Sequence, residues 1–175
     1  MKKLIFSAFM LIGVAFGSQA QDISKNALGL RLGSNDGLGG EISYQRKLSS
    51  DNRLELDLGW RNRSDYYNRG YDDNAIKFTG LYQWVWNIDG GFNWYAGVGG
   101  GLGSWSTDYN KKDEYYNNSG VFVFAAGDIG IEYNFDEVPI MLSLDFRPEF
   151  GLGGNKYYRN NYGSDIALGI RYRFN

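Results

Sequence analysis

The segment Arg53-Leu54-Glu55-Leu56-Asp57-Leu58-Gly59-Trp60-Arg61-Asn62 decides the fold of this chain. From 54 to 60 its even positions are leucines and a tryptophan, and its odd positions are charged residues or glycine. Successive side chains of a β-strand point to opposite faces, so this period of two predicts a strand that separates an apolar from a polar environment. The alternation returns in Ile166-Ala167-Leu168-Gly169-Ile170-Arg171-Tyr172-Arg173-Phe174.

Eight such segments predict an all-β chain, because no long segment carries an apolar stripe at helical spacing. We expect strands at about 27–34, 39–48, 53–62, 75–87, 92–105, 121–135, 140–150 and 166–174. The connections alternate in length. Tight turns are expected at 49–52, 88–91 and 136–139, and the other connections at 35–38, 63–74, 106–120 and 151–163, of which the last three are long and polar. An up-and-down order of strands puts the tight turns at one rim and the long loops at the other.

The first twenty residues have the pattern of an export signal. Two lysines precede an apolar run from Leu4 to Gly17, and Ser18-Gln19-Ala20 supplies small residues at the cleavage site. The run is shorter than the ~20 residues that a transmembrane helix needs, which makes an uncleaved anchor the weaker alternative. We therefore predict a signal peptide at 1–20 and one outer-membrane β-barrel domain at 21–175.

Composition narrows the class of partner. Loss of Lys2 and Lys3 with the signal changes the formal net charge from −2 to −4, which is too mild to predict binding to nucleic acid. The chain has no cysteine, so no disulfide or lipidated cysteine is expected. Its 25 glycines and 17% aromatic residues are unusual for a soluble domain.

Alternation alone does not say which face meets lipid, and a soluble lipocalin-like barrel is the alternative. Glycines occupy the same alternate positions as the charged residues. Such small residues suit a crowded interior that also holds Tyr95, Phe122 and Phe124. On the apolar side of the strands, residues near the strand ends are aromatic, such as Trp60 and Trp84, as is typical where a barrel meets the membrane interface. These features favour a closed antiparallel up-and-down transmembrane β-barrel of eight strands. The charged parity then predicts an ion-pair network in the interior, made of Arg31, Glu41, Glu55, Asp57, Arg61, Lys77, Asp128, Glu132, Asp145, Arg147, Arg171 and Arg173.

The export signal, the eight amphipathic strands, the alternating connections and a last strand ending Arg171-Tyr172-Arg173-Phe174 resemble the small outer-membrane barrels typified by OmpX and the membrane domain of OmpA. The resemblance implies a barrel in the outer membrane of a Gram-negative-type cell, in contact with its lipid and lipopolysaccharide. It also implies assembly by the barrel-assembly machinery, which reads a C-terminal aromatic residue. Phe174 is similar to that signal, whereas Asn175 after it departs from the pattern.

The residue types argue against catalysis. The chain has no histidine, the general base of the barrel enzymes that act on lipids and peptides in this compartment. Zinc lacks its nitrogen and sulfur ligands, and the loop acids have no EF-hand spacing. We therefore expect no enzyme activity, no metal and no cofactor.

The long loops reuse tyrosine beside Asn and Asp, a combination common in binding surfaces. Candidate ligand-binding residues are Tyr66, Tyr67, Tyr71, Tyr115, Tyr116, Tyr157 and Tyr158. The sequence thus predicts a monomeric, non-enzymatic barrel that stabilises the envelope or presents surface loops. Two alternatives stay open, an adhesin that binds glycan or protein through these loops and a narrow channel. Eight strands leave an interior that its own side chains can fill, which disfavours an open pore.

Overall fold

The computed structural model describes residues 23–33, 40–65, 71–111, 114–153 and 161–175, with the backbone alone at 61–65, 71–73, 108–111 and 114–117. The predicted signal peptide at 1–20 lies outside these residues. In the described part of the chain no helix is long and apolar enough to cross a membrane.

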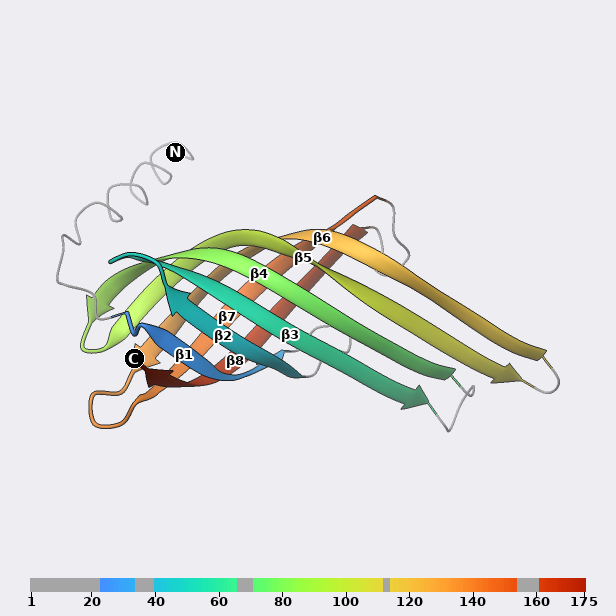
Figure 1. Ribbon diagram of the computed structural model, residues 1–175, viewed down its shortest axis with the longest axis horizontal. Helices are drawn as coiled ribbons and strands as arrows, with labels where there is room; N and C mark the ends of the chain where they lie inside the picture. Colours follow the sequence, from blue (N-terminus) through green and yellow to red (C-terminus); the bar gives the residue numbers. More distant parts are fainter. Residues whose placement is uncertain (1–22, 34–39, 66–70, 112–113, 154–160) are drawn as a thin grey trace, which may run out of the picture.

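Eight antiparallel strands form one closed barrel in chain order (Figure 1). They are β1 (Asn26–Gly33), β2 (Gly40–Lys47), β3 (Asn52–Asp65), β4 (Tyr71–Asp89), β5 (Phe92–Lys111), β6 (Glu114–Asn134), β7 (Ile140–Leu152) and β8 (Tyr162–Phe174). Strand β8 pairs with β1, with Arg31 opposite Gly169, and this pairing closes the barrel. Closure leaves no strand edge within the barrel wall, as a sheet surrounded by hydrocarbon requires. The predicted fold class is confirmed.

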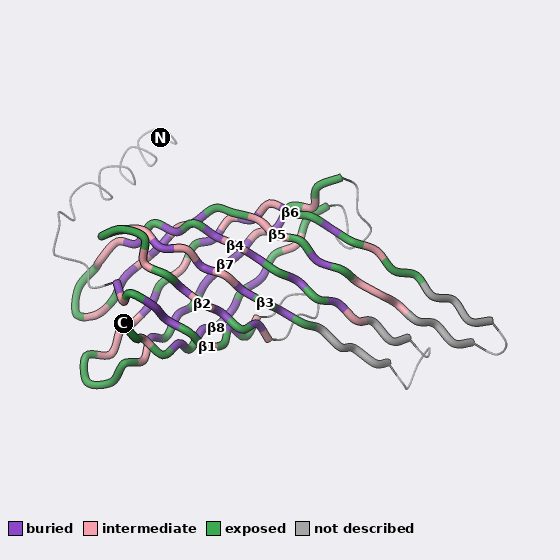
Figure 2. The backbone as a smooth tube through the Cα atoms, viewed as in Figure 1, coloured by how far each residue is buried: buried purple, intermediate pink, exposed green. Residues whose placement is uncertain are grey.

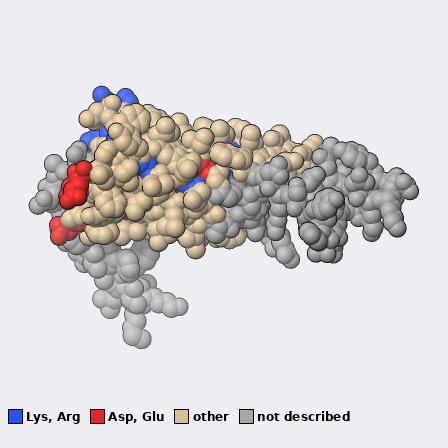
Figure 3. Space-filling view, turned by 90° about the horizontal axis from the view of Figure 1, so that it is seen from below, with Lys and Arg blue, Asp and Glu red and all other residues tan. Residues whose placement is uncertain are grey.

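The alternation of the sequence becomes an alternation between the two faces of the wall (Figure 2). In β3, Leu58 and Trp60 face outward and are 44% and 50% exposed, whereas Glu55 and Asp57 face inward and are 1% exposed. The other strands repeat this arrangement, so the outer surface is apolar and most of the charged side chains of the strands point into the interior. The lipocalin-like alternative, which requires the opposite orientation, is wrong. On the face seen in Figure 3, charged side chains gather mainly at the end of the barrel that holds the short turns.

Three tight connections and both described ends of the chain lie at this rim. The β2–β3 turn is closed by hydrogen bonds from the Leu48 and Ser49 amides to the Asn52 carbonyl. The β4–β5 turn places Gly90 and Gly91 at φ of 55° and 85°, the left-handed region that glycine enters without steric cost. Two glycines at positive φ allow the chain to reverse direction within two residues between β4 and β5.

Inward glycines make room for large rings. A Cβ on Gly130 would lie 2.5 Å from the Tyr95 hydroxyl oxygen, and a Cβ on Gly103 would overlap the Phe122 ring. Tyr95 and Phe122 are themselves no more than 1% exposed. The narrow interior of an eight-stranded barrel therefore accepts such rings only where the facing residue has no side chain.

The expected long loops at 63–74 and 106–120 are largely strand, which corrects the sequence prediction. Strands β3 and β4 stay paired out to Asp65 and Tyr71, and β5 and β6 out to Lys111 and Glu114. Side-chain alternation marks a strand only where its two faces meet different environments, so it stops where both faces meet water while the backbone pairing continues. Of the third expected loop, 151–163, strands β7 and β8 take up residues 151–152 and 162–163, and residues 154–160 lie outside the description.

These longer strands form an outer extension, defined as residues 61–65, 71–75, 105–111 and 114–120, which projects from one end of the barrel (Figure 1). Strand β2 pairs with β3 only as far as Trp60, and β7 pairs with β6 only from Val123. Within the described residues, the extension is thus a four-stranded sheet whose outer edges, 61–65 of β3 and 114–120 of β6, have no strand partner.

Candidate functional site

The interior of the barrel holds the densest cluster of charged side chains in the described structure. Among the described residues, inward positions on every strand except β5 contribute buried charged groups, five cations and eight carboxylates in all. The cations are Arg31, Arg53, Lys77, Arg147 and Arg171, and the carboxylates are Glu41, Glu55, Asp57, Asp128, Glu132, Asp145, Glu149 and Asp165. Charges buried in this way are tolerated only when partners neutralise them and complete their hydrogen bonds.

Arg147 of β7 reaches across the interior to three carboxylates. Its guanidinium lies 3.2 Å from Glu41 Oε2, 2.9 Å from Glu55 Oε1 and 2.7 Å from Asp57 Oδ2. These partners come from β2 and β3, on the wall opposite β7. Because Arg147 is fully buried, it ties two sides of the barrel together through charge-assisted hydrogen bonds.

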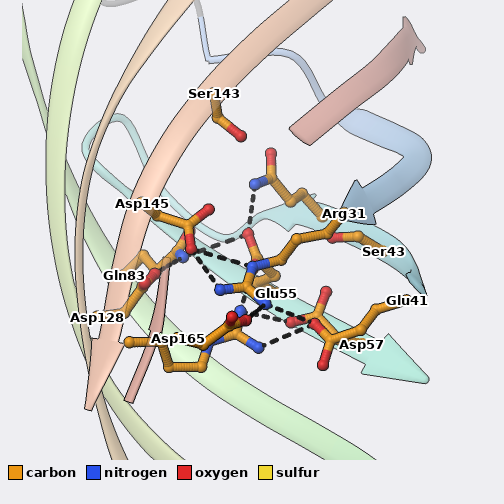
Figure 4. A network of polar contacts seen from close by, with 12 residues as sticks. Arg31, Glu41, Ser43, Glu55, Asp57, Gln83, Asp128, Ser143, Asp145 and Asp165 are labelled. Atoms are coloured by element: carbon orange, nitrogen blue, oxygen red, sulfur yellow. Dashed lines mark hydrogen bonds and ion pairs between the residues drawn. The ribbon is translucent and has the colours of Figure 1, made fainter. Parts of the chain in front are cut away.

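Arg31 of β1 forms a second set of contacts around the same centre (Figure 4). It donates to Glu41 at 2.8 Å, to Asp165 at 2.6 Å and, through Nε, to Asp145 at 3.0 Å. Glu41 is shared with Arg147, so the two arginines belong to one network.

Arg171 of β8 is the third arginine of the network. Its Nη2 lies 3.2 Å from Glu55 Oε2 and donates to the Ser43 hydroxyl oxygen at 2.8 Å, and its Nη1 donates to the Ser143 hydroxyl oxygen at 2.8 Å. A planar guanidinium can satisfy several acceptors at once in this way, which lysine cannot do.

Two further cations are paired on either side of this centre. Arg53 lies 2.6 Å from Glu132 and its guanidinium carbon is 4.7 Å from the centroid of the Tyr95 ring. Lys77 lies 2.7 Å from Glu149 and 5.4 Å from the Phe124 ring centroid. The aromatic faces add favourable cation–π contact to each ion pair.

Asp128 of β6 stands apart from the other carboxylates. Among the described residues it is the only one of the eight that forms no ion pair, and its Oδ1 has no hydrogen-bond partner. Its Oδ2 accepts a hydrogen bond from Gln83 Nε2, and Gln83 also donates to Glu55 at 3.2 Å. Gln83 therefore bridges two carboxylates that would otherwise face each other without a donor between them.

An apolar cluster fills another part of the interior. Leu81, Phe122, Phe124 and Ala126 are buried together, and Trp105 packs against them. A water-filled passage would expose the groups that line it, whereas Arg147, Lys77 and Phe122 are no more than 1% exposed. The described interior is therefore packed with side chains. Its buried cations and carboxylates mostly neutralise one another in ion pairs.

Most of the charged residues named from the sequence lie in this network. Arg173 does not, because it lies at the rim, where its Nη2 donates to the backbone oxygens of Phe135 and Val138. The side chain of Arg61 lies outside the description. The structure also places Arg53, Glu149 and Asp165 in the interior, and all three lie on the inward-facing positions of their strands.

The candidate tyrosines divide into two groups. Tyr71 lies at the start of β4, and Tyr115 and Tyr116 lie near the start of β6, so these three occupy strands of the outer extension. Tyr71 pairs in register with Tyr109, and Tyr109 with Tyr116. The side chains of these residues are outside the description, as are Tyr66, Tyr67, Tyr157 and Tyr158 entirely.

Within the described residues, no group of three or more acidic, histidine or cysteine side chains is arranged to hold a metal ion. No protein-family model matches the chain, and no curated protein matches its sequence.

Solved structures do match its fold. Neisserial surface protein A (NspA) superimposes with a TM-score of 0.59 at 17% identity, over 85% of this chain and 94% of that one. Ail, the attachment invasion locus protein of Yersinia pestis, gives 0.56 at 15%, over 86% and 97%. The N-terminal β-barrel domain of Pseudomonas aeruginosa OprF gives 0.53 at 15%, over 86% and 99%. Ail is also matched in complex with the heparin analogue sucrose octasulfate. At these identities the likeness shows a shared fold, that of small outer-membrane β-barrels.

Proposed function

We propose that the protein is a non-enzymatic outer-membrane barrel that presents the outer extension as a binding surface outside the cell. The observation that carries this proposal is the four-stranded sheet that continues beyond the barrel, with no described strand partner at either edge. An unpaired strand edge offers a row of backbone donors and acceptors, which an extended segment of another protein can join as a further strand.

The orientation follows from the two rims. Short turns and both described ends of the chain lie at the rim opposite the extension. In outer-membrane barrels short turns face the periplasm and longer connections face outside. With the signal at 1–20 removed after export, this orientation places the extension at the cell surface. Assembly by the barrel-assembly machinery is part of the same proposal.

A protein partner is favoured over a polyanionic glycan. The name of the Ail complex shows that a barrel of this fold holds a heparin analogue. In the present chain the sequence of the extension mixes Arg63 and Lys111 with Asp65, Asp72 and Glu114, so it carries no basic excess that would attract sulfate groups. Backbone pairing at a strand edge does not depend on such an excess.

The test uses bacteria that display the full-length protein. Asn62 pairs with Asn74, and Thr107 with Asn118, so each hairpin can be shortened by joining these partners through an Asn-Gly turn. We expect the displaying bacteria to adhere to cultured epithelial cells above a strain without the protein, and the doubly shortened variant to lose this adhesion. Heat-modifiable gel mobility serves as the control for a folded barrel. Equal adhesion of the shortened variant, or none by the parent, would refute the proposal.

A narrow channel is the less favoured function, because the described interior is packed. Planar-bilayer recordings on heat-modifiable protein should show no discrete conductance steps. Reproducible steps that disappear on unfolding would reverse this order of preference.

A further inference from the structure

A groove of about 770 Å³ lies at the base of the outer extension. Its lining crosses β3, β4, β5 and β6, and most of it comes from side chains on the outward face of the sheet. These outward residues are Trp60, Asn74, Ile76, Ser104, Ser106, Ser119 and Val121.

Strand register arranges these residues in two rows. Trp60, Ile76, Ser104 and Val121 are successive partners across the four strands. Two residues further out, Asn74, Ser106 and Ser119 are partners in the next outward row. The row below both is apolar, and consists of Leu58, Phe78, Leu102 and Val123.

The change in polarity from one row to the next indicates the level at which the hydrocarbon of the membrane ends. The apolar row lies in the lipid-facing band, with Leu102 61% exposed, and Val121 in the middle row is 80% exposed. The outermost row is made of amides and hydroxyls only. Two residues of a strand rise about 7 Å, so the groove spans the change from hydrocarbon to headgroups. It is continuous with the membrane-contacting surface of the barrel.

The groove has small residues between larger ones. Ser104 and Ser106 on β5 form its middle, with the half-exposed indole of Trp60 to one side on β3 and Val121 to the other on β6. Within the described residues, the side chains of Asn74, Ser104, Ser106 and Ser119 make no hydrogen bond to the protein. A flat ring beside a set of free hydroxyl and amide groups is complementary to a sugar, whose ring has apolar C–H faces and polar edges.

The charge of the lining narrows the ligand further. None of the described lining residues is a lysine or an arginine, so the described part of the groove offers no partner for a phosphate group. A soluble sugar would leave the apolar lower part of the groove, at Ile76 and Val121, without a matching group. An amphiphile with an uncharged sugar headgroup satisfies both parts.

We infer that this groove binds a glycolipid of the outer leaflet, with an uncharged sugar ring against Trp60 and the serines and an acyl chain along Ile76 and Val121. The inference rests on the orientation proposed above, but not on adhesion. The doubly shortened hairpin variant keeps every outward residue of the groove, so the two proposals fail separately.

The test measures lipid retention by native mass spectrometry of the folded full-length barrel. The probe is n-dodecyl-β-D-maltoside, and phosphatidylglycerol is the competing lipid. Two variants alter the groove: Trp60→Leu removes the ring, and Ser106→Leu fills the middle. Trp84→Leu is the matched control, because Trp84 is also an exposed outward tryptophan but lies at the opposite rim, in register with Asn52.

We expect the parent to retain the maltoside in preference to phosphatidylglycerol. Each groove variant should weaken retention by about tenfold, equivalent to about 1.4 kcal/mol, and Trp84→Leu should leave it unchanged. Heat-modifiable mobility of all three variants establishes that they are folded. Equal retention of the two lipids by the parent would overturn the inference. The same holds if the groove variants bind like Trp84→Leu.

Discussion

Replacing Arg147 with methionine should be among the most damaging single changes in the barrel. Methionine keeps much of the length of the side chain and removes its charge. Arg147 contacts Glu41, Glu55 and Asp57, and it is fully buried. The change therefore tests whether the interior network stabilises the fold or only occupies space.

The expected cost follows from the partners that each carboxylate keeps. Glu41 retains Arg31 at 2.8 Å, and Glu55 retains Arg171 at 3.2 Å. Among the described residues Asp57 has no second cation. Loss of Arg147 thus leaves one buried carboxylate uncompensated, which costs about 3–5 kcal/mol. Adding Asp57→Asn removes that charge, and the double variant should recover about 0.5–3 kcal/mol of the loss.

The assay is urea unfolding of the barrel in lipid vesicles, followed by tryptophan fluorescence, with heat-modifiable mobility as the test of folding. Arg46→Met is the control, since Arg46 is exposed and, among the described residues, its side chain bonds only to Asn26, at 2.7 Å. If Arg147→Met does not fold, Arg147→Lys and Asp57→Asn still allow the order of stabilities to be measured. A loss below about 1 kcal/mol for Arg147→Met would refute the reasoning, because that is the range of a surface ion pair.

Three further predictions concern the stability of the barrel. Asp128→Asn should leave the urea midpoint unchanged or raise it, because it removes a buried carboxylate without an ion pair, whereas Glu132→Gln, which breaks the pair with Arg53, should lower it. Gly101→Leu should destabilise the folded barrel by about 1–3 kcal/mol or more, because its Cβ would lie 2.6 Å from Cζ of Phe124. An unchanged urea midpoint would show that the interior is less tightly packed than the structure indicates. Leu168→Arg should cost about 2–4 kcal/mol in vesicles, and a neutral result would mean that this position does not face hydrocarbon.

The sequence was sufficient to predict the barrel because lipid and interior impose opposite chemistry on neighbouring residues. Leu58 and Asp57 differ by one position and face opposite sides of the wall, so polarity alone reveals both strand and orientation. Eight repeats of this pattern also fixed the number of strands. The tight turns were visible for a separate reason, since Gly90 and Gly91 are needed where φ is positive.

The interior network was predictable as a set, but its pairs were not. Inward parity identifies Arg147 and Glu55 as buried, yet contact between them spans 92 residues of chain and depends on the tilt and stagger of strands in the closed barrel. Asp165 was missed because the expected eighth strand began one residue later. The sequence does not predict the outer groove either, since its serines lie on two strands, β5 and β6, and are brought together only by the strand register.

Three features of the outer end follow from one difference in strand length. In the described part of the chain, β3 continues past Trp60, its last residue paired with β2, and β6 begins before Val123, its first residue paired with β7. Among the described residues, the strand edges without a strand partner (61–65 and 114–120), the polar outward row and the groove all lie close to these two residues. A barrel meant only to stabilise a membrane gains nothing from such unequal strands, because exposed edges invite unwanted pairing. Their presence is therefore the best reason to look for recognition at this end of the molecule, and the base of the extension is where lipid and an external partner would meet.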